Sequence, residues 1–204
     1  MIRRASTVVL FLCLISGPLL AEGDGRSGFY LSPSVGWSVG SGYAFDWHIR
    51  PYSDKFGLGY WLGGGCLYAF GDRYSVGVNV LYQKGTYDWE ITSQFLQPGE
   101  GSEPFHFWTT ALTGTVDIVR FGAAAAFLEA GGGLCWTDWP ETGAFDGTYF
   151  DLLGGLGIRL RLSNRPRPPE LALSASFHHL IDPEEYDTAT ASFFRFGASL
   201  EIGL

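Results

Sequence analysis

The sequence predicts an all-β fold: an eight-stranded antiparallel up-and-down barrel that spans a membrane. Three observations support this prediction. Eight segments alternate with a period of two between large apolar residues and small or polar ones, which is the period of an extended strand. The segments are joined alternately by short turns and long polar loops, as in transmembrane barrels. The whole chain of 204 residues contains only two lysines, Lys55 and Lys84, so neither face resembles the charged outer wall of a soluble barrel.

The N-terminus has the features of an export signal. Arg3 and Arg4 precede VVLFLCLISGPLL, an apolar run of 13 residues that ends just before Ala21. A basic start, a short apolar run and a small residue at the end predict a cleavable secretory signal over 1–21. The run is shorter than the ~20 residues that a spanning helix needs. We expect the remaining chain, 22–204, to form one barrel domain.

The charge of the expected mature chain argues against a nucleic acid partner. Without Arg3 and Arg4, 11 of the 13 basic residues face 21 acidic ones, a net charge of −10. Proteins that bind nucleic acid need a basic surface for the phosphates.

The first predicted strand, 29–45, shows the alternation clearly. Phe29, Leu31, Val35 and Trp37 share one face, and serines and glycines occupy the other. The other seven expected strands are 56–70, 74–89, 105–120, 126–138, 147–162, 169–180 and 189–204.

The connections set the expected orientation. Short turns are predicted at 71–73, 121–125 and 163–170. Longer polar loops are predicted at 46–55, 90–104, 139–146 and 181–188. Because transmembrane barrels have short periplasmic turns, we expect the long loops outside the cell and both termini at the periplasmic end.

The composition of the two strand faces indicates which one meets lipid. The polar face consists mainly of Gly, Ser and Thr, which suits the narrow lumen of eight strands better than a solvated surface. The apolar face is therefore predicted to meet lipid, with two aromatic girdles at its edges. The girdle at the long-loop end is expected to contain Tyr43, Phe45, Phe56, Trp89, Phe105, Trp108, Trp136, Trp139, Phe150 and Phe177. The girdle at the short-turn end is expected to contain Phe29, Phe70, Tyr74, Phe121 and Phe127.

One segment and the pattern of the whole chain resemble a known family. YSVGVNVLYQKG (74–85) is similar to the third-strand segment of PorT-like barrels, and the pattern across the chain resembles small OmpA/PorT-like outer-membrane barrels of Gram-negative bacteria. This resemblance implies the cell outer membrane as the location. It also implies outer-membrane lipid and lipopolysaccharide as partners, and it identifies no extracellular partner.

The C-terminal segment, 195–202, resembles the signal that the barrel-assembly machinery recognises. The resemblance implies that this machinery is a partner of the chain. The positions that match are Gly197, Leu200 and Ile202, and Leu204 stands where an aromatic residue is usual.

A cluster of charged residues is predicted inside the barrel near its periplasmic end. Strand parity points Asp117, Glu129, Arg159, Arg161 and Glu201 inward. A symmetric turn centred on residue 123 would place Asp117 opposite Glu129, and two facing carboxylates need a cation. Arg159 is the expected cation because its planar fork binds carboxylates in pairs. We expect this cluster to plug the lumen.

The remaining polar residues do not form a recognisable catalytic or metal site. No two of the four histidines have a metal-ligand spacing, and we expect all four near the outer rim: His48, His106, His178 and His179. We therefore expect no catalytic residues, no cofactor and no metal.

One segment nevertheless suggests an enzymatic alternative. SFHHLIDPEEYD (176–187) distantly resembles lipid A deacylases, which implies His178 as base and Glu184 or Glu185 as acid. The nucleophile position is Leu180, which has no hydroxyl group. Three functions remain open: a non-enzymatic envelope or surface protein, which we favour, a lipid A-modifying hydrolase, and a narrow channel.

The long loops hold most of the acidic residues. Such charge either forms a solvated face or binds divalent cations shared with lipopolysaccharide phosphates, and the first is the commoner case. The residues are Asp46, Asp54, Glu90, Glu100, Glu103, Glu141, Asp146, Asp182, Glu184, Glu185 and Asp187.

Overall fold

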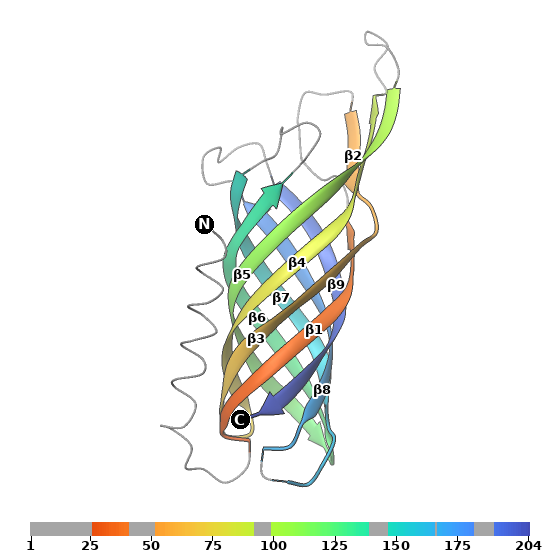
Figure 1. The fold of residues 1–204 in the computed structure, drawn as a ribbon. Coiled ribbons are helices and arrows are strands. Elements are labelled where there is room, and N and C mark those ends of the chain that lie inside the picture. Colours follow the sequence, from red (N-terminus) through yellow and green to blue (C-terminus); the bar gives the residue numbers. More distant parts are fainter. Residues whose placement is uncertain (1–25, 41–51, 92–98, 139–146, 166, 182–189) are drawn as a thin grey trace.

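The structure is a computed structural model that describes residues 26–40, 52–91, 99–138, 147–165, 167–181 and 190–204 (Figure 1). The expected signal segment, 1–21, lies outside the described residues. No helix in the described ranges is long and apolar enough to span a membrane. The strands are β1 (Gly28–Gly40), β2 (Tyr52–Phe56), β3 (Gly59–Phe70), β4 (Tyr74–Ile91), β5 (Gly99–Phe121), β6 (Ala124–Asp138), β7 (Gly147–Arg161), β8 (Glu170–Ile181) and β9 (Thr190–Gly203).

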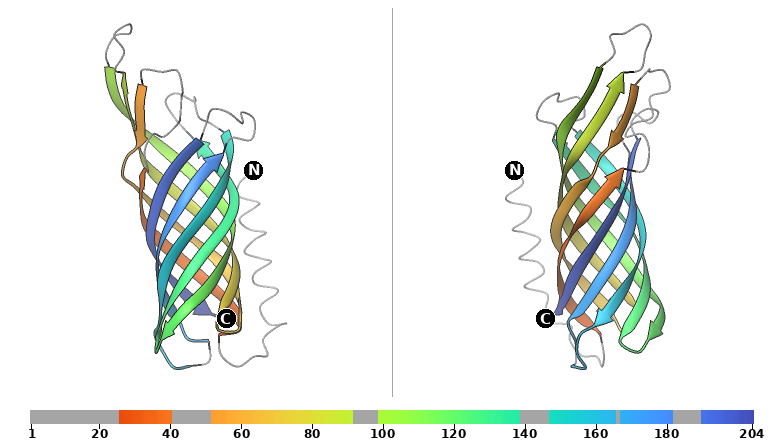
Figure 2. Two further views of the ribbon diagram at one scale, coloured as in Figure 1. Left: turned by 180° about the vertical axis from the view of Figure 1, so that it is seen from behind. Right: turned by 90° about the vertical axis from the view of Figure 1, so that its right-hand side faces the viewer.

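The strands close into one antiparallel ring, which confirms the predicted fold class. β1 pairs with both β3 and β9, and β4 pairs with β5, so the ring has no open edge along its main body. β2 and β3 both pair with the same side of β4, so the nine labelled strands fill eight positions. Figure 2 shows the tilted strands running around the whole barrel.

A β-bulge separates β2 from β3. Phe56 pairs with Tyr87 and Tyr60 pairs with Lys84, so four residue steps on one strand face three steps on β4. The extra residue lies among Gly57, Leu58 and Gly59, and Leu58 is 69% exposed. Bulges bend a strand and redirect its side chains.

Two of the expected loops are partly strand. β4 continues to Ile91 and β5 begins at Gly99, so the hairpin occupies most of the predicted loop 90–104. β2 lies partly within the predicted loop 46–55. Figure 1 shows β2, β4 and β5 continuing beyond the barrel wall at its upper end. The apolar alternation could not reveal this extension because strands above the membrane need no lipid-facing side. Residues 41–45 of the first predicted strand lie outside the described residues.

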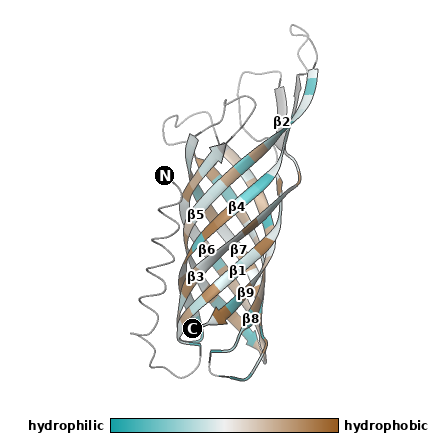
Figure 3. Ribbon diagram, viewed as in Figure 1, coloured by the Kyte–Doolittle hydropathy of each residue, from teal (hydrophilic) through white to brown (hydrophobic). Residues whose placement is uncertain are grey.

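The outer wall is apolar, as the strand parity predicts. Exposed large apolar side chains include Trp37, Leu62, Leu112, Leu156 and Phe196, which come from five different strands. Figure 3 shows apolar stretches alternating with polar ones along the strands. The inward positions carry buried Ser and Thr, among them Ser32, Ser38, Thr109 and Thr113.

Two aromatic residues assigned to the girdles lie in the lumen instead. Phe105 is fully buried and Phe127 is 4% exposed. Phe127 lies beneath the guanidinium of Arg159, whose Cζ is 4.7 Å from the ring centroid. Their parity places them inward, and only their position near a strand end suggested a girdle. Tyr43, Phe45 and Trp139 lie outside the described residues, and the side chains of Phe56 and Trp89 are not described.

The lumen is narrow enough that some positions require glycine. The buried indole of Trp61 lies against Gly36 and Gly197. A Cβ atom added at Gly197 would lie 2.1 Å from this indole, and one added at Gly36 would lie 2.8 Å from it. Side chains, rather than open space, therefore fill this level of the barrel.

Candidate functional site

An ionic network crosses the lumen near the periplasmic end. The Arg159 guanidinium on β7 pairs with the Asp117 carboxylate on β5, and its Nε lies 3.1 Å from Glu201 Oε2 on β9. Each of the three side chains is at most 5% exposed. Arg159 therefore joins strands on both sides of its own strand, and three of the five predicted residues, Asp117, Arg159 and Glu201, meet at the buried centre of the network.

The sequence interpretation missed two members of this network, Arg26 and Glu170. Arg26 is fully buried, its Nε lies 2.7 Å from Glu170 Oε2, and it also pairs with Glu201. Although burial lowers the pKa of Arg26, the Glu201 and Glu170 carboxylates outweigh this effect and raise it. The parity rule could not identify Arg26 because it precedes the first strand. Glu170 lies where the predicted turn 163–170 overlaps the predicted strand 169–180, and it begins β8 at an inward position.

The lower rim continues the network into a more exposed layer. Arg161 Nε lies 3.6 Å from Glu170 Oε1, and the Arg161 side chain is 32% exposed. Arg120 Nη2 lies 2.8 Å from Asp117 Oδ2 and also contacts Asp72. Exposed ion pairs contribute little to stability. Breaking the buried ion pairs above them should therefore have the larger effect on the stability of the barrel.

The predicted contact between Asp117 and Glu129 is wrong. Asp117 pairs in the ladder with Phe127, and Glu129 pairs with Thr115. An irregularity between Asp117 and Val119 shifts the register of β5 against β6. The pairing therefore differs from the one that a symmetric turn centred on residue 123 would give. Glu129 makes no hydrogen bond or ion pair with another described residue and instead lines a cavity above the network.

This cavity is small and is lined by both polar and apolar side chains. Its volume is about 110 Å³, and it lies between Arg159 below and His178 above. Hydroxyl and amide groups line its wall: Asn79 Nδ2 donates to Thr113 Oγ1 over 2.9 Å, and the Ser75 and Thr115 hydroxyls lie 2.6 Å apart. A space of this size with these hydrogen-bonding groups on its wall accommodates a few water molecules.

A second buried polar network lies above the cavity, and the sequence did not predict it. Arg195 on β9 donates to Gln83 over 2.8 Å and to Thr109 over 3.2 Å, which ties three strands together. Its Nη1 also lies 4.0 Å from the Asp151 carboxylate. Arg195 lies in the segment that resembles the assembly signal, its strand parity is inward, and its side chain is 2% exposed.

His178 belongs to this upper network and does not lie at the outer rim. Its Nδ1 is 3.0 Å from the Asp151 carboxylate, and its Nε2 is 3.0 Å from Ser176 Oγ. Its ring stacks on Phe193 with parallel planes and centroids 5.2 Å apart. The prediction that all four histidines lie at the rim is therefore wrong for His178. His48 lies outside the described residues.

The contacts of Ser176, His178 and Asp151 have the connectivity of a hydrolytic triad, but the surroundings do not support that chemistry. Ser176 lies within β8, whose backbone is paired with β7 on one side and β9 on the other. The described backbone around Ser176 therefore has no free pair of N–H groups for an oxyanion. Leu180, at the expected nucleophile position, is buried in the lumen, and Glu184 and Glu185 lie outside the described residues.

An apolar layer closes the lumen above the second network. Phe105, Phe107 and Phe193 are at most 1% exposed. The Phe105 and Phe107 ring centroids are 4.5 Å apart, and those of Phe107 and Phe193 are 6.1 Å apart. The same cluster includes Tyr87, Cys135, Tyr149, Leu180 and Ala191.

The other predicted residues lie as follows. Leu200, Ile202 and Leu204 are exposed on the outer wall, whereas Gly197 faces the lumen. His106 and His179 hydrogen-bond to Tyr82 and Ser192. Within the described ranges, no three His, Cys, Asp or Glu side chains come together as metal ligands would.

Comparisons with known proteins identify the fold. No family model and no curated protein matches this chain. The crystal structure of Neisserial surface protein A (NspA) is similar with a TM-score of 0.62 and 11% identity, over 90% of this chain and 100% of that one. OprG from Pseudomonas aeruginosa, an outer membrane protein, is similar with a TM-score of 0.54 and 12% identity, over 89% of this chain and 99% of that one. The fold is that of a small outer membrane β-barrel.

These similarities and the apolar outer wall agree with the expected location in the cell outer membrane. At 11% and 12% identity the similarity concerns the fold alone, so function has to be argued from the residues of this chain.

Proposed function

We propose that this chain is a non-enzymatic outer-membrane barrel with a plugged lumen, which anchors an extracellular surface rather than conducting solutes. The observation that carries this proposal is the buried ionic network of Asp117, Arg159 and Glu201. A small eight-stranded lumen has room for side chains and little else. Charged side chains that form ion pairs with each other across the lumen leave no continuous path for ions.

Two further layers support the plug. The network around Arg195 and the aromatic layer of Phe105, Phe107 and Phe193 lie between the central cavity and the long-loop end. A solute would have to displace buried ion pairs at one end and buried aromatic rings at the other. Both steps are costly because unpaired charges and exposed apolar surface are each unfavourable.

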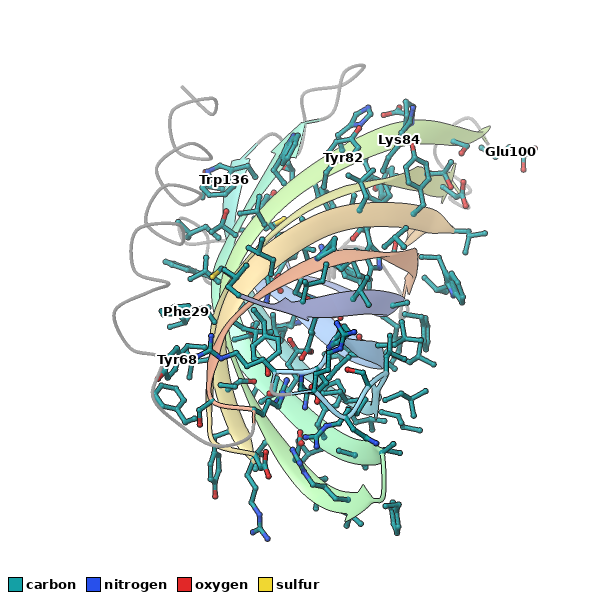
Figure 4. The ribbon with its side chains drawn as sticks, turned by 60° about the horizontal axis from the view of Figure 1, so that its bottom comes forward. Phe29, Tyr68, Tyr82, Lys84, Glu100 and Trp136 are labelled. Carbon is teal, nitrogen blue, oxygen red and sulfur yellow. The ribbon has the colours of Figure 1, made fainter. Side chains whose placement is uncertain are left out.

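The surface that meets the exterior would be the extension of β4 and β5 together with the long loops. Glu100 lies at the far end of β5 in Figure 4, and Asp88 and Glu103 lie on the same hairpin. The net acidity of the chain suggests that an extracellular partner is cationic. We retain membership of the OmpA/PorT-like group, and folding by the barrel-assembly machinery, as parts of this proposal.

Solute uptake by proteoliposomes tests the plug. Vesicles containing the refolded protein should swell no faster in a small sugar or amino acid than protein-free vesicles do. A general porin at the same protein-to-lipid ratio provides the positive control. Swelling at a rate close to that of the porin vesicles would favour the narrow-channel alternative.

The Ser176, His178 and Asp151 contacts are the one observation that favours the hydrolase alternative. A lipid substrate would have to enter the lumen to reach Ser176, because Ser176 and His178 line the lumenal cavity and His178 is 2% exposed. The cavity of about 110 Å³ is smaller than a lipid acyl chain requires. The contacts therefore fit a structural role better than a catalytic one.

A further inference from the structure

A hollow on the outer wall contains an isolated cation. The hollow measures about 600 Å³ and is lined by Trp37, Leu58, Gly59, Tyr60, Lys84, Gly85, Thr86 and Pro104. Trp37, Leu58 and Tyr60 are 58%, 69% and 52% exposed, so the walls of the hollow are apolar and open to the membrane side. We call it the Lys84 groove.

The groove results from the local strand geometry. Trp37, Tyr60 and Lys84 are direct neighbours across β1, β3 and β4. The bulge between β2 and β3 lies at the same place and turns Leu58 out of the wall. The groove is thus bounded by aromatic side chains on one side and by the displaced Leu58 on the other.

Lys84 is unusual because it places a positive charge on the upper outer wall. It is the only lysine or arginine with a described side chain on the upper outer wall: Arg159 and Arg195 face the lumen, and the others lie near the periplasmic end. Lys84 makes no ion pair with a described residue. Figure 4 shows Tyr82 and Lys84 on the same strand, and the Tyr82 hydroxyl is 2.6 Å from His106 Nδ1.

The height of Lys84 matches the outer edge of the membrane. Lys84 lies ten residues above Tyr74, an exposed aromatic at the start of β4. At ~3.4 Å per residue and a tilt of roughly 40–45°, this separation corresponds to about 25 Å along the barrel axis. The apolar band of such barrels is also about 25 Å tall, so Lys84 lies where lipid headgroups begin.

We propose that the Lys84 groove binds a phosphorylated glycolipid of the outer leaflet. The apolar walls formed by Trp37, Leu58 and Tyr60 take an acyl chain, and the Lys84 ammonium pairs with a phosphate of the headgroup. An anionic headgroup is the complementary partner of a single cation on a chain that is otherwise strongly acidic. This proposal does not depend on whether the lumen conducts.

Native mass spectrometry of the refolded barrel tests the proposal. The probes are lipid A with two phosphates and the same lipid after chemical dephosphorylation. Lys84→Gln removes the charge and Lys84→Arg keeps it. Arg165→Gln, at an exposed position in the short-turn end, is the matched control for a lost positive charge. Heat-modifiability on gels confirms that each variant is folded before binding is measured.

We expect Lys84→Gln to bind phosphorylated lipid A about fivefold more weakly than the wild type, the loss for one cation near a membrane surface. Lys84→Arg and Arg165→Gln should bind like the wild type, and the dephosphorylated lipid should bind all four proteins equally. Equal binding of phosphorylated lipid by wild type and Lys84→Gln would overturn the proposal. So would wild-type binding that does not depend on the phosphates, since the groove would then take only the acyl chains.

Discussion

The Nε atom of Arg159 on β7 lies 3.1 Å from Oε2 of Glu201 on β9, although β8 runs between the two strands. The same guanidinium reaches Asp117 on β5, beyond β6. One side chain therefore connects strands that are not neighbours in the ladder. Such a contact is possible only because the inward side chains of a small barrel meet in its lumen.

Arg159→Leu should destabilise the barrel by about 3–5 kcal/mol, because it leaves buried carboxylates without their cation. Urea unfolding of the refolded protein in detergent measures the change. Arg161→Leu is the matched control: its side chain is 32% exposed and its pairs are 3.6 Å and 3.9 Å long. That variant should lose no more than about 1 kcal/mol. Equal midpoints and slopes for Arg159→Leu and wild type would refute the buried network.

Gly197→Ala should destabilise the barrel by about 1–3 kcal/mol through overpacking, because its Cβ would lie 2.1 Å from the Trp61 indole. A Cβ added at Gly154 on β7 meets nothing within 4 Å, so Gly154→Ala serves as the control and should be near neutral. In the Trp61→Leu background, Gly197→Ala should cost less. The same cost in both backgrounds would show that Gly197 is required for another reason, such as assembly.

The sequence predicted most of the fold because the two faces of the wall differ in chemistry. Residues such as Trp37 and Leu156 face outward while Ser32 and Thr113 face the lumen. Successive side chains of a strand point to opposite faces, so this difference appears in the sequence as an alternation of apolar and polar residues. The extension of β4 and β5 above the wall was not predictable in this way. Residues 99–103 extend beyond the wall that meets lipid, and their pairing with β4 continues the register of the strands below.

The charged residues of the lumen were predictable as a class but not as pairs. Parity placed Asp117, Arg159 and Glu201 inward, and the structure joins them. The partner of Asp117 depended on a register irregularity after Asp117 that no local pattern revealed. Arg26 lay beyond the reach of parity, and Arg195 was inward by parity but had no recognised partner in the sequence.

His178→Ala should leave the lipid A of the cells unchanged, because the ring faces the lumen and contacts Asp151 rather than lipid. Mass spectrometry of extracted lipid A provides the measurement. Ser176 should also remain unlabelled by a fluorophosphonate probe in the folded barrel, with Ser176→Ala as the matched control. A deacylated species that disappears in His178→Ala, or labelling that Ser176→Ala abolishes, would establish the hydrolase alternative.

Epitope tags inserted within 92–98 or 182–188 should be reached by antibody on intact cells, because the short turns are expected at the periplasmic end. A tag within 163–169 should be reached only after the outer membrane is permeabilised. A tag placed within 99–104 should lower the yield of folded protein, since those residues pair with β4. Labelling of the 163–169 tag on intact cells, without labelling of the other tags, would show that the topology is the reverse of the one expected.

Single-channel recording in planar bilayers tests the plugged lumen most directly. The wild-type barrel should insert without conductance steps, while a porin in the same bilayers conducts. The variant Arg159→Ser with Phe193→Ala, which removes one side chain from the ionic network below the cavity and one from the aromatic layer above it, should show small steps if it remains heat-modifiable. Steady, reproducible conductance through the wild-type protein would contradict the account.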